Sequence, residues 1–100
     1  MEARRPAPDC GSMEELREQI DRLDRALVAL LAERATYIDR AAELKPGEGL
    51  PARIDARVED VAAKVRAAAE SHRLDPDMVE GLWRSLMDWS IAREERVLGR

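Results

Sequence analysis

The chain has 100 residues, of which 45% are hydrophobic and 38% are charged, and its formal net charge is −4 at pH 7. A chain of this length forms one small domain, and the acidic balance excludes a function that depends on general attraction to nucleic acid or to an anionic membrane surface. Only two Trp and one Tyr are aromatic, and no segment alternates β-branched and aromatic residues as a strand does. The composition therefore predicts an all-α fold with a core built mainly from Leu, Val, Ile and Ala.

Residues 1–12 are expected to form an irregular leader, because Pro6, Pro8 and Gly11 oppose regular structure. The single cysteine, Cys10, lies in this leader and has no second cysteine with which to form a disulfide. The leader lacks the apolar centre of a signal peptide, and no apolar run of the sequence is long enough to span a bilayer. We therefore expect a cytoplasmic location.

Residues 13–44 are expected to form one long helix. Ser12 followed by Glu15 is a capping-box pattern and places the first helical residue at about Met13. The run Lys45-Pro46-Gly47-Glu48-Gly49 (45–49) is expected to stop this helix and to form a mobile loop. Between these signals, apolar residues recur at spacings of three and four and mark one buried face. They are Leu16, Ile20, Leu23, Leu27, Leu30, Leu31, Ile38, Ala41 and Ala42.

The length of this helix predicts a homodimer. A helix of about 32 residues is about 48 Å long, whereas a compact domain of 100 residues is only about 33 Å across. The helix is therefore too long to be covered by its own chain. We expect two long helices to cross or to run antiparallel in an intertwined dimer, each covering the other's exposed part.

Two shorter helices are expected in the rest of the chain, so that residues 13–100 form one three-helix domain. Pro51 suits the first turn of a helix that runs to about His72, and Asp75-Pro76 is a start signal for the next. Both show an apolar face at helical spacing. The expected inner residues are Ile54, Val58, Val61, Val65 and Ala68 or Ala69 in the first, and Val79, Leu82, Trp83, Leu86 and Val97 in the second.

Three cations, Arg17, Arg34 and Lys45, lie where the helical pattern calls for apolar residues or leaves little room for charge. Arg34 and Lys45 are separated by three turns to within about 20°, so both leave the same stripe about 16 Å apart and can reach one small ligand between them. Arg17 lies about 25 Å from Arg34 and about 100° round the helix, so it can share that ligand only from the partner subunit. A cation on a buried face is costly unless an anion meets it, which indicates an acidic partner residue or an acidic ligand.

Polar residues also interrupt the two shorter helices. Ser90 and Glu94 lie one turn apart on the apolar line of the last helix, and Arg57 lies beside the apolar face of the middle one. Together with the three cations, they would form a dry cavity suited to bind a compact polyanion and to stabilise charge that shifts within it. The set contains no activated nucleophile and no metal-ligand spacing, so we expect neither a covalent intermediate nor a metal or other cofactor.

This spaced set resembles the all-helical chorismate mutase family, which also includes isochorismate-pyruvate lyases. The resemblance covers about Cys10 to Val97 and rests on LREQIDRLDRALVALLAER (16–34), on the spacing of Lys45 and Arg57, and on LDPDMVEGLWRSLMDWSIAREE (74–95). It implies a three-helix protomer in an intertwined homodimer with two active sites. It also implies that the substrate is a small dicarboxylate, chorismate or isochorismate.

The resemblance further implies a role for each polar residue of the set. Matching positions of the family bind the substrate's carboxylates, hydroxyl or ether oxygen, and one arginine crosses into the partner's site. The residue matching Glu94 faces the ether oxygen. By role, the catalytic candidates are Arg34, Lys45 and Glu94, and the substrate-binding candidates are Arg57, Ser90 and, across the interface, Arg17.

Two positions depart from the mutase pattern. Val58 directly follows Arg57, where the mutases have an acid that binds the ring hydroxyl, and it looks like the lyase branch. Glu94 stands where many bacterial members have Gln, so its carboxyl must be protonated to donate a hydrogen bond to the ether oxygen. Asp9-Cys10 and the run VEGLW (79–83) also look like the lyase branch.

Three functions follow, in order of preference. The first is a chorismate mutase, which rearranges chorismate to prephenate in a pericyclic step that needs only a held substrate and a stabilised ether oxygen. The second is an isochorismate-pyruvate lyase, which forms salicylate and pyruvate and is favoured by Val58. The third is a non-catalytic helical dimer that serves as an adaptor, which the high charge and the heptad-like spacing allow.

Overall fold

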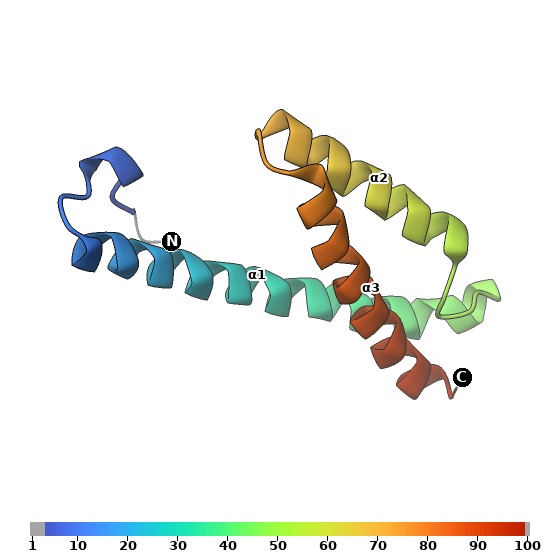
Figure 1. Cartoon of the computed structure of the whole chain (residues 1–100). Helices are drawn as coiled ribbons and strands as arrows, with labels where there is room; N and C mark the ends of the chain where they lie inside the picture. Colours follow the sequence, from blue (N-terminus) through green and yellow to red (C-terminus); the bar gives the residue numbers. More distant parts are fainter. Residues whose placement is uncertain (1–3, 100) are drawn as a thin grey trace. The chain divides into compact units, whose positions relative to one another are not determined.

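The computed structural model describes residues 4–99, and all regular structure within them is helical (Figure 1). A short 3₁₀ helix, η1 (Ala7–Asp9), is followed by α1 (Met13–Glu48), α2 (Asp55–Ser71) and α3 (Pro76–Leu98). This confirms the predicted all-α class and the long first helix. None of these helices is both long and apolar enough to cross a membrane. The chain divides into two compact units, Met1–Thr36 and Tyr37–Arg100, and α1 contributes to both.

The first helix begins at Met13, as the capping signal predicts. The backbone N–H of Glu15 donates to Ser12 Oγ at 3.1 Å, and the Glu15 carboxylate accepts from the backbone N–H of Gly11 at 2.8 Å. The carboxylate thus reaches one residue further back than in the usual capping box. This bond from Gly11, together with the guanidinium of Arg5, lowers the pKa of Glu15.

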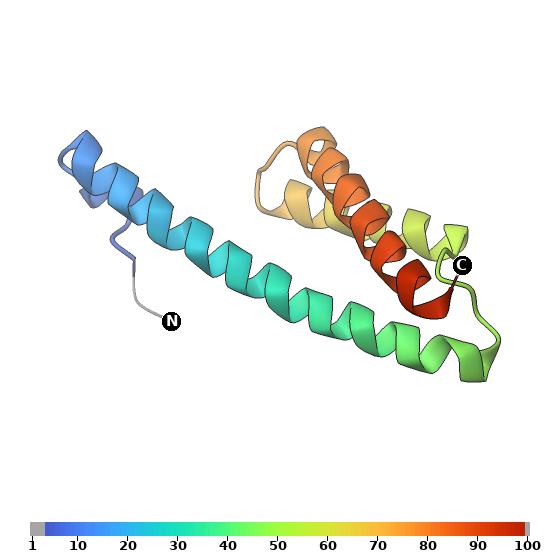
Figure 2. The ribbon, with the colours of Figure 1, turned by 90° about the horizontal axis from the view of Figure 1, so that it is seen from below.

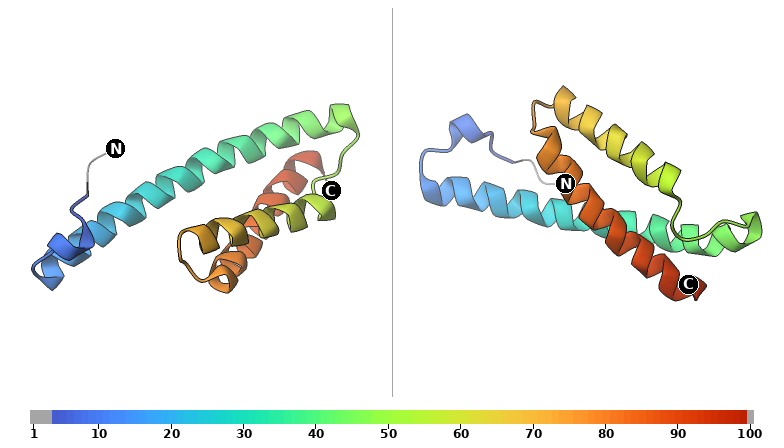
Figure 3. Two further views of the ribbon diagram at one scale, coloured as in Figure 1. Left: turned by 90° about the horizontal axis from the view of Figure 1, so that it is seen from above. Right: turned by 45° about the vertical axis from the view of Figure 1, so that its right-hand side comes forward.

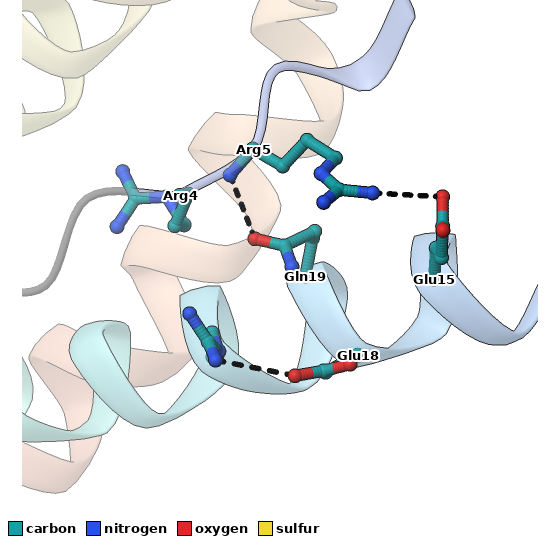
Figure 4. A pocket seen from close by; sticks show the side chains of 6 residues that line it. Arg4, Arg5, Glu15, Glu18 and Gln19 are labelled. Carbon is teal, nitrogen blue, oxygen red and sulfur yellow. Dashed lines mark hydrogen bonds and ion pairs between the residues drawn. The ribbon is translucent and has the colours of Figure 1, made fainter. Parts of the chain in front are cut away.

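The leader is tied to the first turns of α1. It includes η1, so it is not irregular throughout. Arg5 donates its backbone N–H to Gln19 Oε1 at 2.8 Å, and its guanidinium lies 3.0 Å from Glu15. An open polar hollow lies between the leader and α1 (Figure 4), with a volume of about 490 Å³. Glu18 of this hollow pairs with Arg22 at 3.2 Å. The carboxylates of the hollow are matched by its arginines.

Between residues 20 and 31, the apolar stripe of α1 is exposed. Five of its large side chains and the neighbouring Val28 keep between 40% and 65% of their surface exposed. Soluble proteins rarely leave so continuous an apolar surface uncovered, so this stripe has the character of an interaction surface. The six are Ile20, Leu23, Leu27, Val28, Leu30 and Leu31.

The end of α1 differs from the prediction. The helix does not stop at Lys45 but continues through Pro46 to Glu48, so the expected loop 46–49 is mostly helical. Pro46 has no N–H to donate to the carbonyl of Ala42, so it removes one hydrogen bond of the helix. Because it lies in the last turn, few helical residues follow it, and a Schellman motif ends the helix. Leu50 N donates to Lys45 O at 3.0 Å and Gly49 N donates to Pro46 O at 3.2 Å. Gly49 closes the motif with φ +69°.

The start of α2 also differs, because Pro51 precedes the helix and Asp55 is its first residue. The carbonyl of Ala52 accepts a hydrogen bond from Lys45 Nζ at 2.7 Å. A helix that began at Pro51 would bond this carbonyl to the N–H of Ala56 instead. The contact with Lys45 therefore favours the later start.

A tight turn joins α2 to α3, and the two helices lie side by side as an antiparallel pair (Figures 2 and 3). Leu74 N donates to Ala69 O at 2.8 Å in a second Schellman motif, whose left-handed residue is Arg73 with φ 57°. Asp75 caps α3 by accepting from Asp77 N at 2.9 Å, which confirms the predicted start signal.

The core between α2 and α3 is small. Val58, Ala62 and Met87 form its buried centre, and the half-buried Val61, Trp83 and Ile91 pack against it. The prediction included Val58, Val61 and Trp83 but missed Ala62 and Met87. It was wrong for Leu82 and Val97, which are 58% and 64% exposed. An apolar line around a helix is wider than the strip that one neighbouring helix can cover, so residues at its edges stay exposed.

An ion-pair network on the outside joins the same two helices. Arg84 of α3 contacts both carboxylate oxygens of Glu59 of α2, at 2.9 and 3.1 Å, and also pairs with Glu80 at 2.7 Å. Arg66 of α2 lies 2.8 Å from Glu80 and from Asp77. Hydrogen bonds from Arg84, and then from Arg66, lower the pKa of Glu80. The network thus adds charge contacts to a hairpin with little core.

Candidate active site

Lys45 and Glu94 meet in the interior of the second unit. Lys45 lies in the last turns of α1 and Glu94 lies near the end of α3, and Nζ is 2.7 Å from Glu94 Oε1. Their side chains are 16% and 5% exposed. The ammonium also donates to the carbonyl of Ala52 at 2.7 Å. Two of the residues that the sequence assigns to one site are therefore brought together.

The contact between the two charges is an ion pair rather than a hydrogen bond. Although Nζ is close, it does not approach Glu94 Oε1 in hydrogen-bond geometry, and among the described residues no other donor reaches this buried oxygen. A buried oxygen without a hydrogen bond is costly in a protein interior. Glu94 therefore offers a polar atom that a bound molecule can satisfy.

Ser90 lies one turn before Glu94 on α3 and is only 3% exposed. Its hydroxyl donates to the carbonyl of Leu86 at 2.9 Å. Because this bond uses the hydroxyl proton, Ser90 in this geometry would meet a ligand as an acceptor. It lies in the same part of α3 as Glu94, as the sequence predicts.

Arg57 is not brought to the Lys45–Glu94 pair. It lies on the surface of α2, where its side chain is 62% exposed and Nη1 is 2.7 Å from Asp60 Oδ2. Hydrogen bonds from Lys64, and then from Arg57, lower the pKa of Asp60. Val58, the next residue, points into the core between α2 and α3 and is 7% exposed.

Arg17 and Arg34 belong to the other unit, Met1–Thr36. Both lie on α1, where Arg17 is exposed and Arg34 is half-buried. Their roles in substrate binding stay predictions.

The sequence reasoning missed three contributors around the Lys45–Glu94 pair. One is the carbonyl of Ala52, which no side-chain pattern can reveal. The others are Asp39 of α1 and Arg93 of α3, whose side chains form a bidentate pair with distances of 2.6 and 3.0 Å. This hydrogen bonding lowers the pKa of Asp39. The sequence did contain a signal for this second pair. Arg93 directly precedes Glu94, Asp39 precedes Lys45 by less than two turns of helix, and Arg93 and Asp39 carry opposite charges.

The part of the site around Lys45, Ser90 and Glu94 is charged and largely buried. Within residues 4–99, no three side chains of His, Cys, Asp or Glu gather as a group that could hold a metal ion. The arrangement can neutralise and orient an anionic molecule, and Lys45 can stabilise negative charge that develops on an oxygen.

Comparison with known families agrees with this chemistry. Residues 16–95 match the family described as chorismate mutase type II, and this stretch includes every candidate residue of the site. The chain belongs to the chorismate mutase type II family. Membership confirms the resemblance on which the sequence interpretation rests, and the all-helical structure is consistent with it.

Three known proteins align with most of this chain. The chain is 34% identical over 87 residues to the isochorismate pyruvate lyase of Pseudomonas aeruginosa, covering 86% of this chain and 84% of that protein. It is also 37% identical over 79 residues to the T-protein of Enterobacter agglomerans and 31% identical over 85 residues to that of Haemophilus influenzae. These alignments cover 79% and 85% of this chain but only 21% and 22% of the T-proteins. The chain thus spans about a fifth of the length of these T-proteins but most of the lyase.

Proposed function

We propose that this protein is a chorismate mutase that converts chorismate to prephenate by electrostatic stabilisation, without a covalent intermediate. The observation that carries the proposal is the buried Lys45 ammonium, held at 2.7 Å from a carboxyl oxygen of Glu94 that has no hydrogen bond. In a chorismate mutase type II chain, such a pair supplies what the reaction needs at the breaking ether bond.

The rearrangement is pericyclic, so the enzyme must hold a flexible substrate in a reactive shape and stabilise one oxygen. In the proposed mechanism, Lys45 and a protonated Glu94 donate to the ether oxygen as it becomes negative. Arg34 of the same chain and Arg17 of the partner subunit bind the carboxylates. Arg57 and Ser90 complete the contacts with the carboxylate and hydroxyl groups.

Arg57 would have to change its partner for this role. Its present contact with Asp60 is an exposed ion pair on one helix, which is weak in solution because water and salt screen it. A long, exposed arginine side chain can therefore turn from Asp60 to a substrate carboxylate at small cost.

A second candidate function is an isochorismate-pyruvate lyase. Val58 supports it, because this position is apolar and part of the core, whereas the mutase pattern has an acid for the ring hydroxyl. The lyase relative also supports it, since the alignment covers 84% of that protein. The same cations would serve this reaction, because its substrate is a similar dicarboxylate.

A non-catalytic adaptor is the third candidate, and the site argues against it. A buried ion pair contributes little to stability because desolvation offsets the attraction between the charges. An apolar pair at 45 and 94 would serve a purely structural dimer better.

The test is to assay the purified protein on chorismate and on isochorismate separately, following prephenate in the first assay and salicylate in the second. A mutase turns over chorismate with the higher kcat/KM, a lyase turns over isochorismate, and an adaptor consumes neither. The last result would overturn both enzymatic proposals.

A matched pair of lysine variants connects the activity with the site. Lys45→Met should lower kcat/KM by about a hundredfold or more, as expected for the loss of a preorganised charge. Lys64→Met removes the same charge from a side chain that is 69% exposed on α2 and should leave activity unchanged. Equal effects of the two substitutions would exclude a specific role for Lys45.

A further inference from the structure

Two ion pairs join the C-terminal turns of α1 (37–48) to α3. One is the Lys45–Glu94 pair of the proposed site, at 2.7 Å. The other joins Arg93 to Asp39, with Nε at 2.6 Å from Oδ1 and Nη2 at 3.0 Å from Oδ2. The proposed chemistry assigns no role to Asp39 or Arg93.

On α1, the two pairs lie on either side of one buried residue. Ala42 is 2% exposed and is three residues from both Asp39 and Lys45. Because three residues correspond to a rotation of about 300°, Asp39 and Lys45 lie about 60° to opposite sides of Ala42. Ala42 therefore lies between the two charged residues of α1 that contact α3.

The same arrangement occurs on α3. Ser90 is 3% exposed, and Arg93 and Glu94 follow it by three and four residues. They therefore lie about 60° and about 40° to opposite sides of Ser90. Each helix thus presents a small buried residue between two charged ones, and the two ion pairs fix both edges of the contact.

The pair of Asp39 and Arg93 has directional geometry. Two parallel N–H···O bonds between a guanidinium and a carboxylate restrict the relative orientation of the two groups, which a single ammonium contact does not. The guanidinium also lies over the ring of Trp89, 5.3 Å from its centre. Trp89 is one turn before Arg93, so it supports the guanidinium from its own helix.

The apolar core does not provide this restriction. Its buried centre consists of Val58 and Ala62 of α2 with Met87 of α3. It therefore holds α3 against α2 and leaves the rotation of α3 relative to α1 to the contacts at 39–45 and 90–94.

We propose that Asp39 and Arg93, supported by Trp89, are positioning residues that hold the Glu94 carboxyl against Lys45 in its catalytic orientation. The proposal rests on the proposed function, because it assigns the pair a purpose in the same site. Neither residue touches the reacting atoms in this scheme. Both act through the rotation of α3.

The kinetic test uses Asp39→Asn, which keeps the shape of the side chain and removes its charge. We expect kcat on the preferred substrate to fall at least about tenfold while KM changes less than about threefold, because misplacement of a catalytic group affects the chemical step most. The matched control is Glu59→Gln, which removes an equally bidentate pair between α2 and α3 and should leave kcat unchanged. An unchanged kcat in Asp39→Asn, or an equal loss in Glu59→Gln, would overturn the proposal.

Exchange of the charges adds a rescue experiment. The double variant Asp39→Arg with Arg93→Glu should recover part of the kcat lost in either single variant, because a guanidinium and a carboxylate again face each other. Arg93→Lys keeps the charge without the bidentate fork and should have an intermediate kcat. If Asp39→Asn does not fold, Arg93→Lys takes its place in the kinetic and the stability measurements. No recovery in the exchanged pair would count against positioning by this contact.

A stability measurement tests the proposal without any substrate. If the pair orients Glu94, the Tm shifts of Asp39→Asn and Glu94→Gln should not add in the double variant, whereas those of Asp39→Asn and Glu59→Gln should add. Additive shifts in both combinations would overturn the proposal. If the wild-type protein consumes neither substrate, the proposed function fails, and this coupling still decides whether Asp39 and Glu94 act together.

Discussion

The role proposed for Glu94 depends on what replaces its contact with Lys45 when a substrate binds. In the structure, the ammonium lies 2.7 Å from the carboxyl oxygen and compensates its negative charge. An anionic substrate that binds Lys45 competes with Glu94 for the ammonium, and the proposed substrate presents an ether oxygen that can only accept hydrogen bonds. A buried carboxylate facing an acceptor repels it, whereas a carboxyl group donates to it. The proposed mechanism therefore requires Glu94 to donate a hydrogen bond from a carboxyl group in the complex.

If Glu94 donates to the ether oxygen as proposed, kcat/KM should decline as the pH rises from about 5 to 8, because only the protonated carboxyl can donate. Glu94→Gln, which always carries donor hydrogens, should flatten this profile and raise activity at the upper end. Calorimetric titration in buffers of different ionisation enthalpy should show proton uptake for the wild type and none for the variant. A flat wild-type profile with no gain in the Gln variant would mean that Glu94 is not at the ether oxygen.

Single residues show where sequence reasoning works and where it ends. Lys45 and Glu94 could be predicted together because their spacing matches a family pattern and each interrupts an apolar line. The contact between Arg93 and Asp39 could not, because the residues are 54 positions apart and each looks like an ordinary charge on a charged helix. The carbonyl of Ala52 has no sequence signature, since every residue has a carbonyl.

Two helix ends use the same cap with different residues. The Schellman motif after α1 places Gly49 in the left-handed region, and the motif after α2 places Arg73 there, at φ 57°. A residue with a Cβ is strained in this region, whereas glycine is not. The sequence signals for helix ends identified the glycine but gave no sign that arginine would take the same place.

Arg73→Gly should therefore stabilise the protein by about 0.5–1 kcal/mol, the relief of backbone strain less the added freedom of glycine in the unfolded chain. Gly49→Ala is the opposite control and should destabilise by about 1 kcal/mol. A Cβ at Gly49 would meet no atom within 4 Å, so the loss would come from the backbone conformation. Urea denaturation at one fixed protein concentration measures both changes. Changes of the same sign would contradict this account.

The hairpin of α2 and α3 should lose stability in acid. The guanidinium of Arg84 lowers the pKa of Glu59 and Glu80, so their contribution is fully present above the ordinary value of 4.5 and is lost as the pH falls through the lowered values. The urea midpoint should therefore fall between pH 6 and about pH 3, and Glu80→Gln should reduce this fall because it removes one of the carboxylates. A midpoint that rises in acid, or an unchanged pH dependence in Glu80→Gln, would contradict the assignment.

At the scale of the whole molecule, the apolar stripe of α1 is the strongest argument for association. Leu27, Val28 and Leu30 are each more than half exposed, which is costly for a protein in water. The sequence predicts both this face and a partner for it, but one chain cannot reveal which surface covers it. Association in an intertwined dimer therefore stays a proposal.

Mixing two inactive variants tests the dimer and the origin of Arg17 together. Arg17→Ala and Arg34→Ala should each be nearly inactive. After exchange of subunits, about a quarter of the sites should regain both arginines, because half of the dimers are mixed and each has one intact site. Mass spectrometry verifies the exchange, and the activity of the mixture gives the result. No recovery in verified mixed dimers would mean that Arg17 serves its own chain.

The length of the connection between α1 and α2 determines where the Lys45 ammonium lies. Lys45 is bound at both of its ends, since its carbonyl accepts from the backbone N–H of Leu50 and its ammonium donates to the carbonyl of Ala52. These two bonds join Lys45 to residues 50 and 52, so an added or removed residue between them would move the ammonium. Substitutions in this connection should therefore be tolerated better than insertions or deletions. In homologues that use the same lysine, we expect the number of residues in this connection to vary less than their identity.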